Sequence, residues 1–156
     1  DLDGKPVTLA EFRGKTVVLE WINPNCPVSR GYADRKVMVR TAAAHPEAVG
    51  LAIDGTARKR GDYLAAAEHK AYDVKRGIAY PVLYDTSGEV GRAYGAKTTP
   101  HMFVIDEIGK VAYNGAIDSG PGEKSTNYVD AALTALANGK RPDPAVTQPM
   151  GCSVKY

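Results

Sequence analysis

The sequence predicts an α/β sandwich with a mixed central sheet, and three features of its pattern indicate this fold class. In the first part of the chain, short apolar runs alternate with segments of helical periodicity, which is typical of parallel strands joined by helices. Residues 101–105 and 110–114 flank a turn that contains Gly109, which predicts an antiparallel hairpin. A last helical segment follows, so the sheet should begin with parallel pairing and end with antiparallel pairing.

The segment around residues 16–22 (TVVLEWI) is the strongest strand signal in the chain. It is a nearly continuous run of apolar and β-branched residues, as in a strand covered on both faces. Before it, residues 3–9 (DGKPVTL) predict a turn and a short strand, one arm of an N-terminal hairpin extension. After it, turn residues and Pro27 predict a helix start, and a helix is expected over residues 28–44.

The remaining elements are predicted by the same signals. Asp62 is expected to cap a helix over residues 62–72, after a charged loop. Further strands are expected at 49–53 and 80–84, and further helices at 87–94 and 125–137. We therefore expect one domain over residues 1–139 and an irregular tail over residues 140–156, which carries Cys152 and three prolines.

Composition excludes several function classes. A chain of 156 residues can bury a sizeable core, and a net charge of +2 without a Lys/Arg run argues against nucleic acid as a partner. The longest apolar stretches, such as residues 17–19, are far shorter than the ~20 residues that span a bilayer, so we expect no membrane insertion. The chain starts at Asp1 without Met, which indicates a processed product and, with the tail cysteine, favours an extracytoplasmic location.

The chain has two cysteines, Cys26 and Cys152. Two thiols cannot build a four-thiolate zinc site, and a domain of this size needs no disulfide framework. Three interpretations stay open: a redox pair, one long-range structural bridge, or two unrelated thiols. We expect no cofactor and no resident metal.

Cys26 lies just after the buried strand and just before the predicted helix. The partial positive charge and free N–H groups of a helix N-terminus favour a thiolate over a thiol. The thiolate is the attacking species in redox and nucleophilic chemistry, so this position predicts a reactive cysteine. The alternative is a buried, inert cysteine at the end of a strand.

Two segments of this chain resemble the thioredoxin-like superfamily. Residues 18–29 (VLEWINPNCPVS) look like its strand–turn–helix active site, and residues 98–106 (TTPHMFVID) resemble the segment that bears its cis-proline. The entry sequence 1–15 (DLDGKPVTLAEFRGK) resembles the redoxin branch, the alkyl hydroperoxide reductase/thiol-specific antioxidant (AhpC/TSA) family. The similarity extends to about residue 137, and the ending 151–156 (GCSVKY) resembles one redoxin subgroup. The resemblance implies a thioredoxin-like three-layer sandwich.

Three departures limit what this resemblance implies. The second cysteine of the thioredoxin dithiol motif is replaced by Ser29. The Pro and Thr that peroxiredoxins place before their reactive cysteine are replaced by Leu19 and Asn23, which removes the hydroxyl that activates peroxide. The second cysteine of this chain, Cys152, lies in the tail, where a resolving cysteine would be.

The resemblance implies roles for four further residues. Glu20 matches a buried acid of thioredoxins that exchanges a proton with the thiol; the alternative is a solvent-facing strand residue. Pro100 matches the cis-proline, and the backbone of Thr99 would align an extended substrate beside the thiol; the alternative is a trans-proline at a strand start. Cys152 would resolve an oxidised Cys26; the alternative is a permanent bridge that holds the tail.

Four functions therefore compete. The first is a thiol-disulfide oxidoreductase or antioxidant protein acting on protein or small-molecule thiols and disulfides, with an unidentified electron donor. The second is a thiol peroxidase that forms a Cys26 sulfenic acid. The third is a non-catalytic binding module with an inert Cys26–Cys152 disulfide, and the fourth is a metal site that adds His101 to both thiols. His101 is more simply a core or rim residue, and His45 and His69 are expected on solvated faces.

Overall fold

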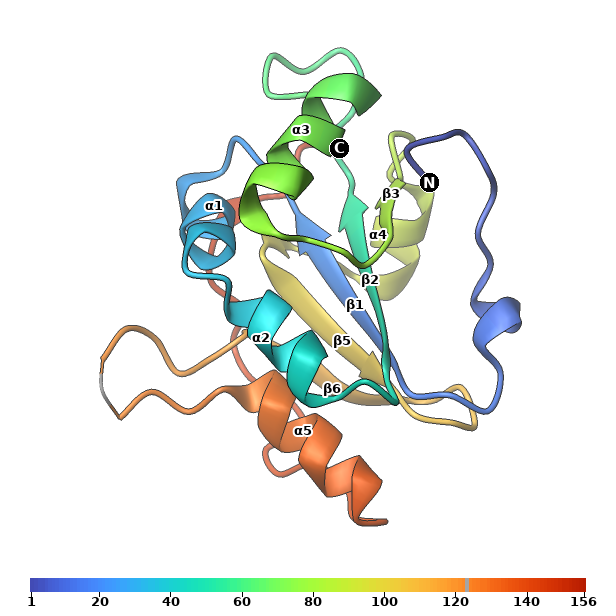
Figure 1. The fold of residues 1–156 in the computed structure, drawn as a ribbon, viewed down its shortest axis with the longest axis vertical. Helices are drawn as coiled ribbons and strands as arrows, with labels where there is room; N and C mark the ends of the chain where they lie inside the picture. The colour runs from blue at the N-terminus through green and yellow to red at the C-terminus, as the bar shows by residue number, and fades with distance from the viewer. Residues whose placement is uncertain (123) are drawn as a thin grey trace.

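The central sheet has five strands in the order β3-β2-β1-β5-β6 in the computed structural model, which describes residues 1–122 and 124–156. The strands are β1 (Val17–Ile22), β2 (Val49–Asp54), β3 (Val82–Tyr84), β5 (His101–Ile105) and β6 (Val111–Gly115). β1, β2 and β3 pair in parallel, whereas β5 pairs antiparallel with both β1 and β6. The predicted mixed sheet is therefore confirmed, and β1 lies at its centre (Figure 1).

β1 is covered on both faces, and all six of its residues are buried. Val18 packs in a cluster with Met38 of α2 (Val37–Ala44) and Leu133 of α5 (Tyr128–Ala137). Trp21, which points the opposite way, packs in a second cluster that includes Tyr94 of α4 (Glu89–Tyr94). Helices on each side of the sheet produce the three layers, because every β1 side chain needs an apolar partner.

The long helix expected after Cys26 is two helices. α1 (Pro27–Asp34) ends at Arg35, and the left-handed backbone of Lys36 (φ 55°) separates it from α2. α3 (Ala66–Arg76) also begins later than expected. Its N-cap is Ala65, so the Asp62 carboxylate does not cap it and instead accepts a hydrogen bond from Asn23 Nδ2 (2.8 Å).

The expected N-terminal hairpin is wrong. Within residues 1–16 the described chain forms no strand; it forms a 3-10 helix, η1 (Leu9–Phe12). The Glu11 carboxylate accepts the backbone N–H of Thr8 (2.7 Å), and Asp1 Oδ1 accepts those of Asp3 and Lys5 (2.9 Å each). These local bonds satisfy the polar groups that a strand ladder would otherwise use.

The tail is more ordered than the sequence predicts. After α5 it returns along β6, where Val146 bridges Asn114 in parallel. It then forms β7 (Cys152–Ser153), which pairs antiparallel with the short strand β4 (Thr98–Thr99). The tail crosses the end of the sheet that carries Cys26, which places its own cysteine within bonding reach.

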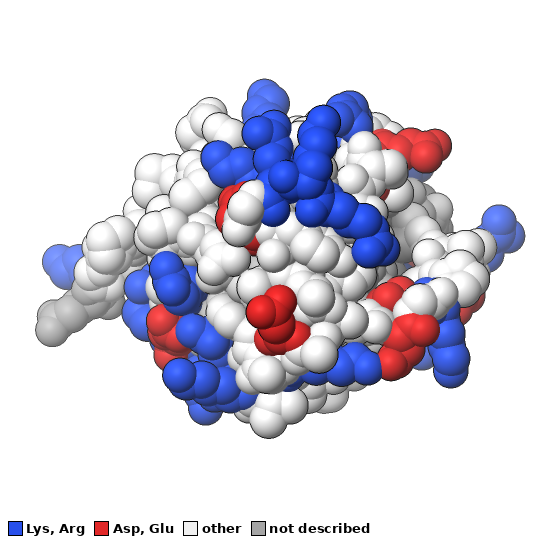
Figure 2. All heavy atoms as spheres, turned by 90° about the horizontal axis from the view of Figure 1, so that it is seen from above, with Lys and Arg blue, Asp and Glu red and all other residues white. Residues whose placement is uncertain are grey.

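The surface and the helices bear on possible partners. On the face seen in Figure 2, Lys and Arg side chains form several groups separated by neutral surface and by Asp and Glu. Among the residues that the structure describes, no helix has the length and apolar character needed to cross a bilayer.

Candidate redox site

The turn between β1 and α1 positions Cys26, and the buried side chain of Asn23 holds this turn together. The backbone N–H of Cys26 donates to the Asn23 carbonyl (3.0 Å), and Asn23 Oδ1 accepts the N–H of Asn25 (2.7 Å). Cys26 is the N-cap of α1 and Pro27 is its first helical residue. The sulfur of Cys26 therefore belongs to the positively polarised end of the helix, as the sequence predicts.

The Thr99–Pro100 segment lies directly beside Cys26. The Thr99–Pro100 peptide bond is cis, as the resemblance implies. The Thr99 carbonyl oxygen lies 3.2 Å from Cys26 Sγ, and Thr99 and Pro100 are both buried. The structure thus brings these three residues together across 73 positions of sequence.

Cys152 is bonded to Cys26, which excludes two unrelated thiols and leaves a redox pair or a long-range structural bridge. The disulfide joins residues 126 positions apart, and the two Cα atoms are 6.0 Å apart, a usual separation for a disulfide. In the β4–β7 pairing, Cys152 is the partner of Thr99. A Cβ on Gly151 would lie 2.1 Å from the Thr99 carbonyl oxygen, so only glycine lets the tail approach this closely.

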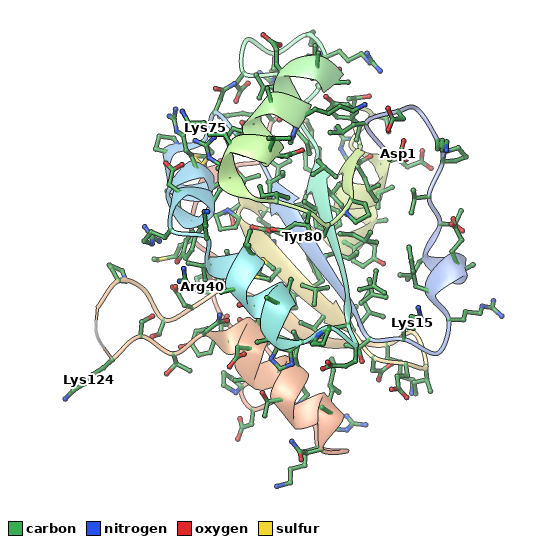
Figure 3. All side chains as sticks on the ribbon, viewed as in Figure 1. Asp1, Lys15, Arg40, Lys75, Tyr80 and Lys124 are labelled. Carbon is green, nitrogen blue, oxygen red and sulfur yellow. A yellow bond between two sulfur atoms is a disulfide. The ribbon has the colours of Figure 1, made fainter. Side chains whose placement is uncertain are left out.

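Glu20 is buried on the same face of β1 as Val18 and Ile22. Burial raises the pKa of Glu20 from 4.5 to about 7, although the hydrogen bond that Tyr80 donates to it (3.2 Å) acts in the opposite direction. Figure 3 shows Tyr80 between α2 and α3, above the sheet. Glu20 and Ser29 line one cavity of about 20 Å³, which has room for one water molecule. The acid and the position where a dithiol motif has its second cysteine therefore border the same cavity.

His101 is a structural residue. Its Nδ1 accepts the backbone N–H of Lys97 (3.1 Å), so Nε2 carries the proton and donates to Asn114 Oδ1 (2.7 Å). Burial lowers the pKa of His101, and its ring packs on Phe103 at 4.5 Å between centroids. Both ring nitrogens are engaged away from the sulfurs.

The expectation that His45 and His69 are solvated is wrong. His69 is fully buried, with Nε2 3.5 Å from Asp54 Oδ2 and Nδ1 3.3 Å from the Asp73 carboxylate. Burial alone would lower the pKa of His69, but the two carboxylates outweigh it and raise the pKa to about 9. His45 Nε2 lies 2.8 Å from Asp130, between α2 and α5. The spacing of His69 and Asp73, one helical turn apart, is the sequence signal that could have indicated this ionic cluster.

Leu19 and Asn23, which replace the Pro and Thr of peroxiredoxins, have structural roles in this protein. Leu19 belongs to the apolar cluster around Trp21 and Phe103. The amide of Asn23 is occupied by Asn25 and Asp62. Neither side chain presents a hydroxyl to Cys26.

A mixed five-stranded sheet with a disulfide at the N-terminus of the helix after its central strand, facing a cis-proline, defines a protein of the thioredoxin-like fold. The model of the AhpC/TSA family matches residues 1–114, and the chain belongs to that family.

Similar proteins include enzymes of two kinds. The chain is 32% identical over 115 residues to the thiol-disulfide oxidoreductase ResA of Bacillus thuringiensis subsp. konkukian, covering 71% of this chain and 60% of that protein. It is 30% identical over 124 residues to the chloroplastic peroxiredoxin Q of Triticum aestivum, covering 72% of this chain and 52% of that protein. The match thus spans little more than half the length of these relatives.

The solved structures agree with the predicted fold. A hypothetical protein from Sinorhizobium meliloti superposes with a TM-score of 0.86 at 25% identity, over 100% of this chain and 88% of that chain. The structural neighbours are thioredoxin-like folds, which confirms the predicted fold class.

Proposed function

We propose that this protein is a thiol-disulfide oxidoreductase that uses Cys26 and Cys152 as its redox pair. The observation that carries the proposal is the placement of the Cys26–Cys152 disulfide at the N-terminus of α1, with Cys152 paired to Thr99. A static bridge would hold the tail equally well anywhere along the sheet. This bridge instead joins Cys26, whose sulfur lies at a helix N-terminus, to Cys152, which pairs with Thr99 beside the cis-proline.

The reaction proceeds by two thiol-disulfide exchanges. The Cys26 thiolate attacks one sulfur of a substrate disulfide, which forms a mixed disulfide and releases the first substrate thiolate. The Cys152 thiolate then attacks Cys26 Sγ, which forms the Cys26–Cys152 disulfide and releases the second substrate thiolate. The substrate gains two electrons, and a thiol or dithiol donor that reduces the Cys26–Cys152 bond returns the protein to its starting state.

Thr99 and Pro100 align the substrate in this proposal. In the oxidised protein the tail strand forms an antiparallel pair with Thr99, in the manner of an added β-strand. An extended substrate segment would pair with Thr99 in the same way. The tail and such a substrate therefore compete for one backbone edge, and residues 151–153 move aside when a substrate binds.

Glu20 supplies or removes a proton during the exchange. Its pKa of about 7 lets it exist in both protonation states near neutrality, which suits general acid–base catalysis. Ser29 lines the same cavity and contacts the turn that carries Cys26, because Ser29 Oγ accepts the N–H of Asn23 (3.3 Å). A water molecule in this cavity would complete the proton path.

The test uses the reduced protein and a chromogenic disulfide, 5,5′-dithiobis(2-nitrobenzoate), at less than one equivalent. The wild type should release thionitrobenzoate in two phases, one for each exchange. Cys152→Ser should keep the first phase and lose the second, with a stable mixed disulfide visible by mass spectrometry. Cys26→Ser should lose the fast first phase, and a fast first phase that persists in Cys26→Ser would exclude Cys26 as the nucleophile.

Peroxide reduction is a second candidate because one relative is named a peroxiredoxin and the family includes thiol-specific antioxidants. The Cys26 thiolate would attack the peroxide to form a sulfenic acid, and Cys152 would condense with it to the same disulfide and water. Stopped-flow oxidation by hydrogen peroxide tests this. A rate no greater than that of free cysteine would exclude it, and the Asn23 side chain in place of a hydroxyl leads us to expect that result.

The proposed partners are protein or small-molecule disulfides and a thiol donor. We also propose an extracytoplasmic location, because disulfides, the substrates of the proposed reaction, form and persist in oxidising compartments. Trapping the mixed disulfide of Cys152→Ser in cells and identifying the attached chain by mass spectrometry would report both the substrate and its compartment.

A further inference from the structure

Two features hold the tail on either side of Cys152. Upstream, Thr147 Oγ1 accepts the N–H of Ala116 (2.9 Å), and a Cβ on Gly115 would lie 2.1 Å from that oxygen. Downstream, the ring of Tyr156 lies against helix α4. Cys152 is therefore on a short segment with an anchor at each end.

Tyr156 occupies a slot that exists because two residues of the α4 region lack side chains. A Cβ on Gly91 would lie 2.2 Å from Tyr156 Oη and 2.7 Å from Cε1, and a Cβ on Gly88 would fall into contact with Cδ1 of the same ring. Gly88 has a positive φ of 71°, which favours glycine in any case. Gly91 lies within the helix and has no positive φ that would require glycine. Glycine at a helical position weakens the helix relative to alanine. The Tyr156 ring explains its presence.

The slot also satisfies the polar parts of Tyr156. The phenol donates a hydrogen bond to the Ala96 carbonyl (2.9 Å), and the guanidinium of Arg92 lies 4.6 Å above the ring centroid. Arg60 Nη2 donates to the main-chain oxygen of Tyr156 (3.1 Å). The backbone between the slot and Cys152 is held as well, because Val154 N–H donates to Lys97 O (3.1 Å).

We propose that Tyr156, seated in the Gly88–Gly91 slot, is the positioning residue that returns Cys152 to Cys26 after a substrate has displaced the tail from Thr99. The inference rests on the proposed function, because it assigns Tyr156 to the second of the two exchanges. Cys152 and Tyr156 are four positions apart in the chain, so a displaced Cys152 stays within about 14 Å of the slot. A short tether of this kind keeps the effective concentration of the Cys152 thiol high beside the mixed disulfide.

The readout is the second thionitrobenzoate phase of the reduced protein with substoichiometric 5,5′-dithiobis(2-nitrobenzoate). Tyr156→Ala should slow this phase by roughly tenfold, because the tail then loses its side-chain anchor at α4 and keeps only Thr147 and the main-chain contacts of residues 154–156. The first phase, attack by Cys26, should keep its rate. Tyr156→Phe keeps the ring in the slot and loses the hydrogen bond to the Ala96 carbonyl. The rate of its second phase should therefore lie between those of the wild type and Tyr156→Ala.

Gly91→Ala separates positioning from general stability. The added Cβ meets the far end of the Tyr156 ring, which can leave the slot without disturbing the backbone, and alanine strengthens helix α4. The variant should therefore fold and yet show the same slow second phase as Tyr156→Ala. Combining the two substitutions should slow it no further, because the slot is already empty. Gly61→Ala, in an exposed loop where a Cβ meets nothing within 4 Å, is the matched control and should behave as wild type.

The outcomes distinguish this inference from the proposed function. If the wild type shows both phases and neither Tyr156→Ala nor Gly91→Ala slows the second one, Tyr156 does not position Cys152, although the exchange mechanism stands. If the wild type lacks the Cys26-dependent first phase, the proposed function itself fails. A far-ultraviolet circular dichroism spectrum identical to that of wild type establishes that each variant is folded.

Discussion

The two cysteines of this site are held by different means. Cys26 is fixed mainly by its own neighbourhood: the buried strand β1, the Asn23 turn and the first turn of α1 all lie within residues 17–30. Cys152 is fixed by contacts with Gly115, Thr99 and the α4 slot, which are all distant in sequence. The comparison teaches that the nucleophile is built by local structure and its partner by long-range docking, so the two can be perturbed separately.

The largest effect should come from the buried ionic cluster at the end of β2, which lies beside β1 on the Cys26 side. His69→Leu leaves Asp54 and Asp73 buried without a cation, so we expect the free energy of unfolding at pH 7 to fall by about 3–5 kcal/mol. In wild type this stabilisation should be fully present below pH 6.5 and lost as the pH rises through about 9, because the folded pKa of His69 is raised.

Urea unfolding across this pH range measures the effect. Lys70→Met, at the next position on α3, removes an exposed pair with Asp3 and should leave the free energy of unfolding almost unchanged, because solvent screens such pairs. If local structure holds Cys26 and distant contacts hold Cys152, the equilibrium constant for closing the Cys26–Cys152 disulfide should be unchanged in the folded His69→Leu protein. A shifted equilibrium would mean that the ionic cluster and the disulfide are coupled.

Glu20 gives an effect of similar size in a different pH window. Its folded pKa is raised from 4.5 to about 7, so the folded state keeps a proton that the unfolded state has lost. Stability should therefore fall as the pH rises from 4.5 to 7, by up to about 3 kcal/mol. Glu20→Gln should abolish this slope and be more stable than wild type at pH 8.

The control is Glu107→Gln, on the exposed turn between β5 and β6, whose stability curve should run parallel to that of wild type. A slope that survives in Glu20→Gln would show that another group titrates there. The same variant should also flatten the pH profile of the first thionitrobenzoate phase if Glu20 exchanges a proton with the thiol.

On the Cys152 side, Gly151→Ala should act on the disulfide more than on the fold. The added Cβ would meet the Thr99 carbonyl at 2.1 Å, so the tail strand must move away from β4. A clash of about 1–3 kcal/mol would lower the equilibrium constant for closing the Cys26–Cys152 bond by roughly 5- to 150-fold. Mass spectrometry of alkylated samples from glutathione buffers measures this constant. An unchanged constant, equal to that of Gly61→Ala, would show that strand pairing does not position Cys152.

The smallest effect should be at the upstream anchor. Thr147→Val keeps the shape of the side chain and removes the oxygen that accepts the Ala116 N–H and bonds the Tyr113 hydroxyl (2.5 Å). We expect the free energy of unfolding to fall by about 1 kcal/mol. Thermal unfolding with Thr134→Val, on the exposed side of α5, as the control would show whether the cost is specific to the tail. Equal stabilities of the two variants would contradict the assignment of Thr147 as an anchor.

The sequence by itself determined the Cys26 half of the site and the mixed pairing of the sheet, parallel first and antiparallel last. The run TVVLEWI is apolar at nearly every position, so it can only be a strand covered on both faces, and Pro27 marks the helix start that places Cys26 at its N-terminus. These signals are local, because propensity and periodicity act between near neighbours. They fail where local hydrogen bonds compete, as at Asp1 and Glu11, which replace the expected hairpin with a turn and a 3-10 helix.

Only the tertiary structure decided where Cys152 lies and which polar groups are buried. The tail carries no periodic pattern, and its strand exists because Thr99 offers a free backbone edge and Gly151 permits a close approach. His69 is hidden in a charged stretch that predicts a solvated face, yet two carboxylates from different elements enclose it. Both outcomes depend on contacts between distant segments, whose free energy is set by packing and desolvation, and these are properties of the folded chain.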